Sequence, residues 1–228
     1  VALEGQVYCW GVGIDGLNGT GSEDVALTPV PIASTVRMQQ VGVGQFSACA
    51  LAESGDVYCW GRDLYGMLGQ GRPGRSLVPV LVTGGRQYTA LAVGGQHVCA
   101  LDTARQAWCW GYSPSVGSAA SSASASQSVQ SPQAVDGGRR YVAITAAFGH
   151  TCALDEGNAA WCWGSNGAAT LGDGTTENRT SPVPVAGNLR FRQISAGGTA
   201  TCGIVTDATL ACWGMNSYGQ LGFTPGDP

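Results

Sequence analysis

Charge is scarce in this sequence, and lysine is absent altogether. Only 11% of the 228 residues are charged, against roughly 25% in an ordinary soluble domain. All eleven basic residues are arginines, and fifteen acidic residues bring the net charge to −4. Because nucleic-acid binding relies on basic side chains that neutralise phosphates, this composition argues against a nucleic-acid partner.

Long apolar runs and the short motifs of catalysis are missing as well. No segment approaches the ~18 uninterrupted apolar residues of a membrane-spanning helix, so we expect no direct membrane insertion. The sequence contains no Gly-x-Ser-x-Gly, no phosphate-binding loop and no His-Glu-x-x-His. We therefore predict neither an enzyme nor a cofactor.

Histidine occurs only twice, at His97 and His150, each two residues before a cysteine. A Cys–His nucleophile or a metal site joining the two rings is conceivable. A structural role is favoured, since Ser47 and Ala200 occupy the same repeat position elsewhere. We predict no catalytic residue and no metal site.

Glycine is abundant, with 36 residues, and cysteine recurs with a regular period. The tripeptide Cys-Trp-Gly begins at positions 9, 59, 109, 162 and 212, at intervals of 50, 50, 53 and 50 residues. A second cysteine series precedes all but the first by ten residues. Self-similarity at this period predicts a repeat architecture.

Each repeat carries several short β-prone segments and no helical periodicity. Segments 57–60 and 107–110 end at glycine, and segments 190–194 and 141–144 alternate polar and apolar residues. The proline-containing segments 78–80 and 183–185 suit edge strands, because proline cannot donate to a sheet. Four strands per ~50 residues predict an all-β propeller, with a β-solenoid as the alternative.

The repeat phase divides the single propeller region 1–228 into four full blade-length units and part of a fifth. These units are approximately 5–54, 55–104, 105–157, 158–207 and 208–222. The third unit has three extra residues, between Cys109 and Pro132. Segment 113–131 there is rich in Ser and Ala, a composition that buries little apolar surface, so we expect a flexible loop.

The two cysteine series predict disulfides. If Cys49 and Cys59 lie on one antiparallel hairpin, Leu51 faces Val57, and the two cysteines face each other with α-carbons about 4.5 Å apart. That distance suits a disulfide. The alternatives are free core thiols or a metal site, although a ten-residue spacing fits no zinc pattern. The predicted pairs are Cys49–Cys59, Cys99–Cys109, Cys152–Cys162 and Cys202–Cys212.

Disulfides imply an oxidising compartment, so we expect a secreted, periplasmic or cell-surface protein. Cys9 has no partner in this scheme, because its hairpin position falls upstream of Val1. We therefore expect Cys9 to be unpaired or paired outside the chain, and the chain to be part of a longer propeller.

One ten-residue motif resembles a known family. Trp-Gly-x-Asn-x-x-Gly-Gln-Leu-Gly stands at 213–222, with weaker copies at 60–69 and 163–172, and Gly-His-Thr-Cys-Ala-Leu stands at 149–154. Together they resemble the regulator of chromosome condensation repeat family, in the cysteine-paired variety of secreted bacterial proteins and crinkly-type receptor ectodomains. The resemblance implies a larger ring, possibly seven-bladed, closed by further blades or neighbouring chains.

Aromatic and asparagine side chains in the predicted loops are the candidate ligand contacts. We expect the tryptophans of the repeat to pack between blades, because they recur once per unit. The loop residues are better candidates, since tyrosine combines apolar area with a hydroxyl group. They are Tyr65, Tyr112, Asn166, Asn216 and Tyr218. Two loop asparagines, Asn18 and Asn178, match the N-glycosylation pattern.

From these features we predict an extracytoplasmic binding or scaffold module. Its disulfide-reinforced blades hold loops in position for a protein or glycan partner. Two alternatives remain: a structural subunit of a surface assembly or filament, and a propeller-type enzyme inhibitor.

Overall fold

The computed structural model describes residues 4–122 and 127–223. Within these residues the chain forms seventeen strands in five antiparallel sheets, here called I to V. Sheet I holds β1 (Tyr8–Gly11) and β2 (Ala26–Pro31). Sheet II holds β3 (Met38–Val43), β4 (Ser47–Ala52), β5 (Val57–Asp63) and β6 (Gly74–Leu81). Sheet III holds β7 (Tyr88–Val93), β8 (His97–Asp102), β9 (Ala107–Tyr112) and β10 (Ser128–Ala134).

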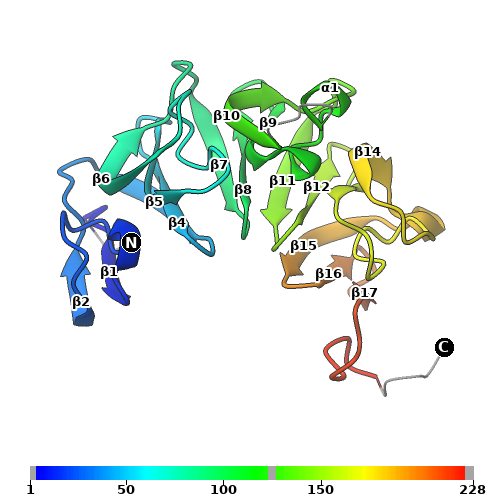
Figure 1. Cartoon of the computed structure of the whole chain (residues 1–228). Coiled ribbons are helices and arrows are strands. Elements are labelled where there is room, and N and C mark those ends of the chain that lie inside the picture. Colours follow the sequence, from blue (N-terminus) through cyan, green and yellow to red (C-terminus); the bar gives the residue numbers. More distant parts are fainter. Residues whose placement is uncertain (1–3, 123–126, 224–228) are drawn as a thin grey trace.

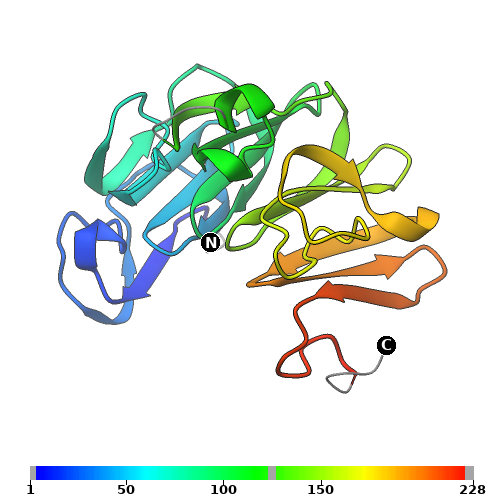
Figure 2. The same cartoon turned by 45° about the vertical axis from the view of Figure 1, so that its right-hand side comes forward.

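Sheet IV holds β11 (Tyr141–Ala146), β12 (His150–Asp155), β13 (Ala160–Gly164) and β14 (Arg179–Pro184). Sheet V holds β15 (Phe191–Gly197), β16 (Ala200–Val205) and β17 (Leu210–Gly214). The sheets follow one another along an open arc, with the two chain ends at its opposite ends (Figure 1). The first strands of neighbouring sheets II to V contact each other, and the rotated view in Figure 2 shows the same succession. This is the predicted all-β propeller architecture.

Sequence units and sheets are staggered by two strands. Unit 5–54 supplies β1 and β2 to sheet I but β3 and β4 to sheet II, and each later unit is divided in the same way. The described strands therefore amount to four groups of four and one further strand. They nevertheless form three four-stranded sheets, because each unit begins in the middle of a sheet.

The central hairpin of each complete sheet has the predicted register. Cys49 pairs with Cys59 and Leu51 with Val57, and the same pattern recurs in sheets III, IV and V. Disulfides join all four predicted cysteine pairs, with α-carbons 4.0–4.1 Å apart. These distances belong to directly opposed, non-hydrogen-bonded positions of an antiparallel ladder. Cys9 is a free, half-buried cysteine, and burial raises the pKa of its thiol.

The periodic prolines all lie on the outermost strand of a sheet. They are Pro29, Pro79, Pro132 and Pro182, on β2, β6, β10 and β14. In each of these strands the pairing register shifts across the proline; for example, Cys59 pairs with Val80 but Gly61 pairs with Ser76. A bulge tolerates the missing N–H, which explains why proline recurs there without breaking the sheet.

Aromatic side chains fill the space between sheets. Trp60, Trp110 and Trp163 are completely buried. The Tyr88 ring lies 6.3 Å from the Trp110 ring, and Tyr141 lies 6.1 Å from Trp163. Each tyrosine begins the first strand of the sheet in which the tryptophan sits on the third strand. The repeat tryptophans of the middle sheets are therefore core residues, as expected.

The expectation of a flexible loop over 113–131 is wrong for both of its ends. The segment begins with the short helix η2 (Ser113–Ser115), continues into α1 (Ala119–Ser122) and ends in β10 from Ser128 onward. Val116 is fully buried, and Gly117 lies against the Trp163 indole. The small residues of this segment were interpreted as a sign of flexibility. At Gly117 a small residue is instead required, because only a small residue fits against the Trp163 indole. Residues 123–126 lie outside the described part of the chain.

Candidate functional site

In sheets II, IV and V, the loop after the third strand is held by one side chain, three residues beyond the repeat tryptophan. Asn166 Oδ1 accepts the Leu171 amide at 2.9 Å, and Asn216 Oδ1 accepts the Leu221 amide at 3.0 Å. Asp63 Oδ1 accepts the Leu68 amide at 3.2 Å. The remaining Asn166 hydrogen bonds are also internal, because its Nδ2 donates to Asp173 and to the Thr175 carbonyl.

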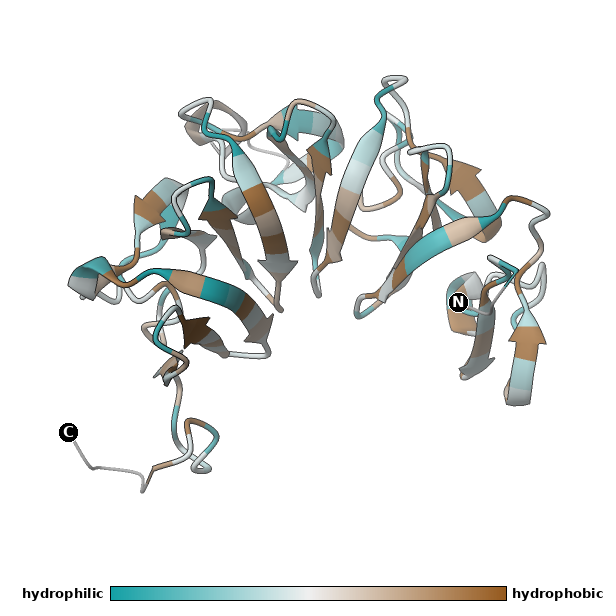
Figure 3. Cartoon of the chain, turned by 180° about the vertical axis from the view of Figure 1, so that it is seen from behind, coloured by the Kyte–Doolittle hydropathy of each residue, from teal (hydrophilic) through white to brown (hydrophobic). Residues whose placement is uncertain are grey.

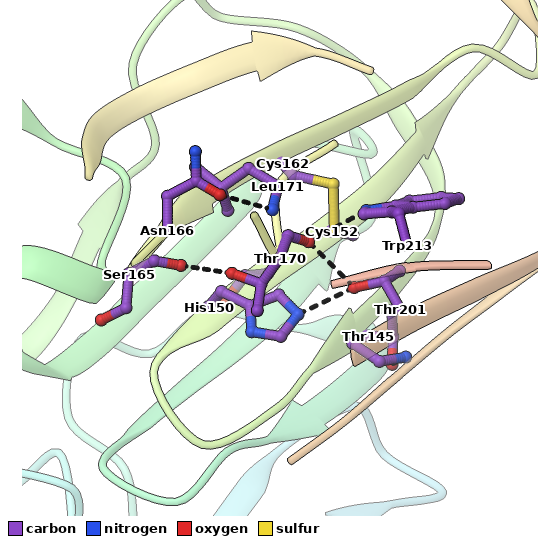
Figure 4. Close-up of a disulfide and its surroundings, with 12 residues drawn as sticks. Thr145, His150, Cys152, Cys162, Ser165, Asn166, Thr170, Leu171, Thr201 and Trp213 are labelled. Carbon is purple, nitrogen blue, oxygen red and sulfur yellow. Dashed lines mark hydrogen bonds between the residues drawn. A yellow bond between two sulfur atoms is a disulfide. The ribbon is translucent and has the colours of Figure 1, made fainter. Parts of the chain in front are cut away.

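Two predicted ligand contacts are therefore structural residues. Asn166 is fully buried, and its side chain is occupied by the loop (Figure 4). Asn216 Nδ2 donates to the Phe223 carbonyl at 3.1 Å, which closes the loop after β17 in the same way. The asparagine of the repeat motif therefore folds its own loop, and in Asn166 both N–H groups of the side chain are used inside that loop.

The tyrosines behave differently. Tyr65, in the β5–β6 loop, and Tyr112, at the end of β9, come from neighbouring sheets and make a tilted contact, with ring centroids 5.1 Å apart and an interplanar angle of 58°. Both are partly exposed. The Ser128 hydroxyl donates to the Tyr65 carbonyl at 2.8 Å and so fixes the backbone of the loop that carries that ring. The pair forms an aromatic surface that bridges sheets II and III.

An arginine and two phenylalanines lie in or beside the turns of sheets II and IV. The Arg62 guanidinium lies 5.8 Å from the centre of the Phe46 ring, within the range of a cation–π contact. The Arg62 amide donates to the Phe46 carbonyl, which joins the β3–β4 turn to the start of the β5–β6 loop. Phe148 is 47% exposed in the matching turn of sheet IV. We call Phe46, Arg62, Tyr65, Tyr112 and Phe148 the aromatic rim.

Sequence reasoning found the two tyrosines of the aromatic rim and missed the other three residues. Phe46 and Phe148 stand outside the repeat pattern of aromatic residues, which is part of the signal that singled out Tyr65. Arg62 could be placed only with the structure, because its neighbour Phe46 comes from the preceding turn. Tyr218 is 91% exposed but lies in the loop after β17, at the far end of the arc.

A cavity of about 200 Å³ opens beside the rim at the β5–β6 loop, lined in part by Asp63, Gln70, Arg72 and Arg75. Asp63 is 7% exposed, and its Oδ2 has no hydrogen-bond partner within the described residues. Burial raises the pKa of this carboxyl group, although backbone amides of the loop lower it in part. The loop of sheet IV has an asparagine at this position, whose Nδ2 is satisfied.

The two histidines are linking residues between sheets. His97 Nε2 lies 2.6 Å from the Thr151 hydroxyl of the next sheet, and His150 Nε2 lies 2.8 Å from that of Thr201 (Figure 4). Thr201 in turn donates to the Thr170 carbonyl at 3.1 Å. Burial lowers the pKa of His97 to about 3 and that of His150 to about 4. Both rings are therefore neutral at pH 7, and their cysteine neighbours are held in disulfides.

A second arginine–aromatic arrangement lies away from the rim. Arg86 stacks over the Trp108 ring at 3.3 Å, and Arg139 stacks over Trp161 at 3.4 Å. The indole of Trp108 donates to Asp102, as that of Trp161 does to Asp155. Each tryptophan ring is covered by an arginine, and its indole N–H is bound by a carboxylate. The ring face and the N–H are therefore already used within the chain.

The two glycosylation candidates differ in accessibility. Asn18 is 3% exposed, and its amide nitrogen donates to the Gly11 carbonyl at 3.0 Å. A glycan on that nitrogen would break the loop, so the structure contradicts Asn18 as an acceptor. Asn178 is exposed, although its Oδ1 accepts the Asn166 amide at 2.7 Å.

The described residues contain no cluster of three or more His, Cys, Asp or Glu side chains that could hold a metal ion. Among the described helices, none has the length and apolarity needed to cross a bilayer.

Comparison with known proteins identifies the repeat. The model of the regulator of chromosome condensation (RCC1) repeat matches residues 4–51, 54–101 and 158–204, more than half of the chain. The chain belongs to the RCC1 repeat family. A second RCC1 repeat model matches 38–66, 141–168 and 191–220. The loop of the third RCC1 repeat, which lacks the Asn-x-x-Gly-Gln-Leu-Gly element, lies outside all of these stretches.

Solved structures share the fold at low sequence identity. Prp20p from Saccharomyces cerevisiae, described with its binding properties to Gsp1p and histones, matches with a TM-score of 0.82 at 21% identity, over 98% of this chain and 57% of its own. Human WBSCR16 matches with 0.76 at 21%, over 87% and 52%. The ectodomain of the Physcomitrella patens receptor kinase CR4 matches with 0.56 at 24%, over 80% and 43%.

The chain thus spans about half the length of these structures. A search of curated proteins found no match. At these identities the similarity establishes the propeller fold and nothing about the ligand.

Proposed function

We propose that the chain is a protein-binding module that works outside the cytosol and receives its partner on the aromatic rim. The observation that carries the proposal is the tilted Tyr65–Tyr112 ring contact, with its centroids 5.1 Å apart across two sheets. Tyrosine and arginine dominate the binding energy of protein interfaces, because they offer large contact areas at low entropic cost.

The backbone that carries the rim is tied down by hydrogen bonds, which supports a binding role. The Tyr65 carbonyl accepts the Ser128 hydroxyl, and the Phe46 carbonyl accepts the Arg62 amide. Less backbone then has to be ordered on binding, and a pre-ordered surface binds more tightly for the same area. The RCC1 repeat structure of Prp20p is described as binding proteins, which agrees in kind with this proposal.

The extracytoplasmic location rests on the four disulfides. Each closes a ten-residue separation inside a core hairpin. Disulfides of this kind persist in oxidising compartments and are rare in the cytosol. Fractionation of the source cells with an antibody to the chain tests this part. Recovery in the cytosolic fraction with nine alkylatable cysteines would refute it.

A display-library selection tests the rim. Random protein binders selected on the wild-type chain are measured on the double variant Tyr65→Ser/Tyr112→Ser and on the control Tyr8→Ser, which removes an exposed tyrosine from sheet I. We expect most binders to lose at least about tenfold in affinity on the double variant, the effect of ~1.4 kcal/mol, and to keep their affinity on the control. Equal binding to both variants would refute the rim, and tyrosine-dependent binding on a glycan array would favour a glycan ligand instead.

A further inference from the structure

Asp63, the last residue of β5, is a buried carboxylate with one oxygen left unpaired. The strongly hydrophobic segments of the molecule lie mainly in the strands (Figure 3), and Asp63 is only 7% exposed at the end of one of them. Its Oδ1 accepts the Leu68 amide, but its Oδ2 has no hydrogen-bond partner among the described residues. Because a buried acceptor without a partner costs free energy, a donor from outside the chain would stabilise this position.

The cavity of about 200 Å³ at this loop is lined by charged residues of both signs. Arg75 lines it, but its guanidinium is bound by Glu23 and lies 3.6 Å from Asp15. Arg72 lines it as well and is exposed, so water and salt screen its charge. The Asp63 carboxylate is buried and is screened less. The cavity therefore favours a cation over an anion beside Asp63.

The corresponding loop of sheet IV shows what completes such a site. It has the same length as the loop of sheet II, because the flanking strands pair with the same offset. Asn166 stands there in place of Asp63, and seven residues later Asp173 stands in place of Gln70. Each loop therefore contains one carboxylate and one amide, in exchanged positions.

In sheet IV a guanidinium of the chain itself binds the carboxylate. Arg179 Nε donates to Asp173 Oδ2 at 2.9 Å, and its Nη2 donates to the Thr175 hydroxyl at 3.2 Å. Burial raises the pKa of Asp173, but hydrogen bonds from Arg179 and Thr175 outweigh burial and bring that pKa below its ordinary value. The pKa of Asp63 stays raised by burial. Ser76 stands in sheet II where Arg179 stands in sheet IV, so sheet II has no arginine at this position.

We infer that the cavity receives an arginine side chain of the protein partner, whose guanidinium donates to the unpaired Asp63 oxygen. This inference rests on the proposed function, since Tyr65 of the aromatic rim lies on the same loop as the cavity. The partner's guanidinium supplies in sheet II what Arg179 supplies in sheet IV. A guanidinium suits the site better than an ammonium group, because its planar fork of N–H donors matches a carboxylate.

Titration with a small arginine derivative tests the cavity without any partner. Nα-acetylarginine amide carries the guanidinium, and Nα-acetylcitrulline amide has nearly the same shape without the charge. We expect nuclear magnetic resonance to show saturable binding of the arginine derivative to the wild-type chain in the millimolar range. The citrulline derivative and Nα-acetyllysine amide should each bind at least about tenfold more weakly.

Two variants locate the binding. Asp63→Asn removes the carboxylate, and Ser76→Arg supplies a guanidinium from the chain itself, so each should weaken binding of the arginine derivative at least about tenfold. Asp56→Asn and Ser54→Arg make the same two changes in the β4–β5 turn, at the other end of sheet II, and should bind like the wild type. Urea unfolding at an unchanged or higher midpoint shows that the variants are folded.

The inference is wrong if the wild type shows no saturable binding of the arginine derivative, or if it binds the citrulline or the lysine derivative equally well. It is also wrong if Asp63→Asn leaves the affinity unchanged, or if the control variants lose as much as the two cavity variants. The titration and the display selection fail separately. Selected binders that ignore the rim would refute the rim alone, and a failed titration beside rim-dependent binders would refute the cavity alone.

Discussion

The middle of the arc and its N-terminal end are made from the same repeat. In the middle the repeat tryptophans are buried and the repeat cysteines are paired, whereas in sheet I they are not. Trp60, Trp110 and Trp163 are buried, whereas Trp10 is 63% exposed. All other cysteines are in disulfides, while Cys9 is free. A repeat of this kind is stabilised by contacts with its neighbours. The same residue therefore contributes more to the free energy of unfolding in the middle of the arc than at its end.

Replacing the repeat tryptophan gives the largest contrast. Trp110→Ala leaves a cavity between sheets II and III and removes the hydrogen bond to Met67, so we expect a loss of about 3–5 kcal/mol. Trp10→Ala should cost less than about 1 kcal/mol, because that indole is already in water. Urea unfolding of both variants measures the difference. Equal losses would show that burial does not distinguish the middle from the end.

The disulfides give the next contrast. Cys99→Ala/Cys109→Ala removes a bridge that closes a ten-residue separation in sheet III, and we expect a loss of about 2–3 kcal/mol. Cys9→Ala should change little. Mass spectrometry of the denatured protein should find one alkylated cysteine before reduction and nine afterwards. More than one before reduction would contradict the pairing.

The histidines make the middle sensitive to acid. Because burial lowers the pKa of His97 to about 3 and of His150 to about 4, the unfolded chain binds more protons than the folded chain below the ordinary pKa of about 6.5. Stability should therefore fall as the pH is lowered from 7, by about 2 kcal/mol per histidine at pH 5. His150→Gln should remove about half of this dependence in urea unfolding at pH 5 and 7. An unchanged slope would contradict the buried neutral ring.

Replacing Asp63 should give the smallest change in stability. Asp63 lies in a loop in the middle of the arc, yet its Oδ2 has no hydrogen-bond partner among the described residues. Asp63→Asn removes a buried negative charge at the position that Asn166 occupies in sheet IV, so we expect a gain of about 1 kcal/mol at pH 7. Burial raises the pKa of Asp63, so its protonation stabilises the folded chain and the gain should shrink as the pH falls. Asn166→Asp is the reciprocal variant and should destabilise. A pH-independent gain would mean that the carboxyl is not the source.

Much of the fold could be predicted because the repeat acts locally. Hairpin register follows from two cysteines and the turn between them, and edge strands follow from prolines that cannot donate. The candidate site was harder. Tyr65 and Tyr112 were identified one by one, but their contact depends on the placement of two sheets. Asn166 was misassigned because its partners, Asp173 and Thr175, lie in a loop whose path the sequence does not show.

The sequence by itself determined the period, the strand pairing within each hairpin and the disulfide partners, since these depend on residues close together along the chain. Only the tertiary structure decided how units share sheets, which glycines receive a tryptophan and which aromatic residues remain available to a partner. Those outcomes depend on what lies across the gap between two sheets, and the contacts there join residues about fifty positions apart.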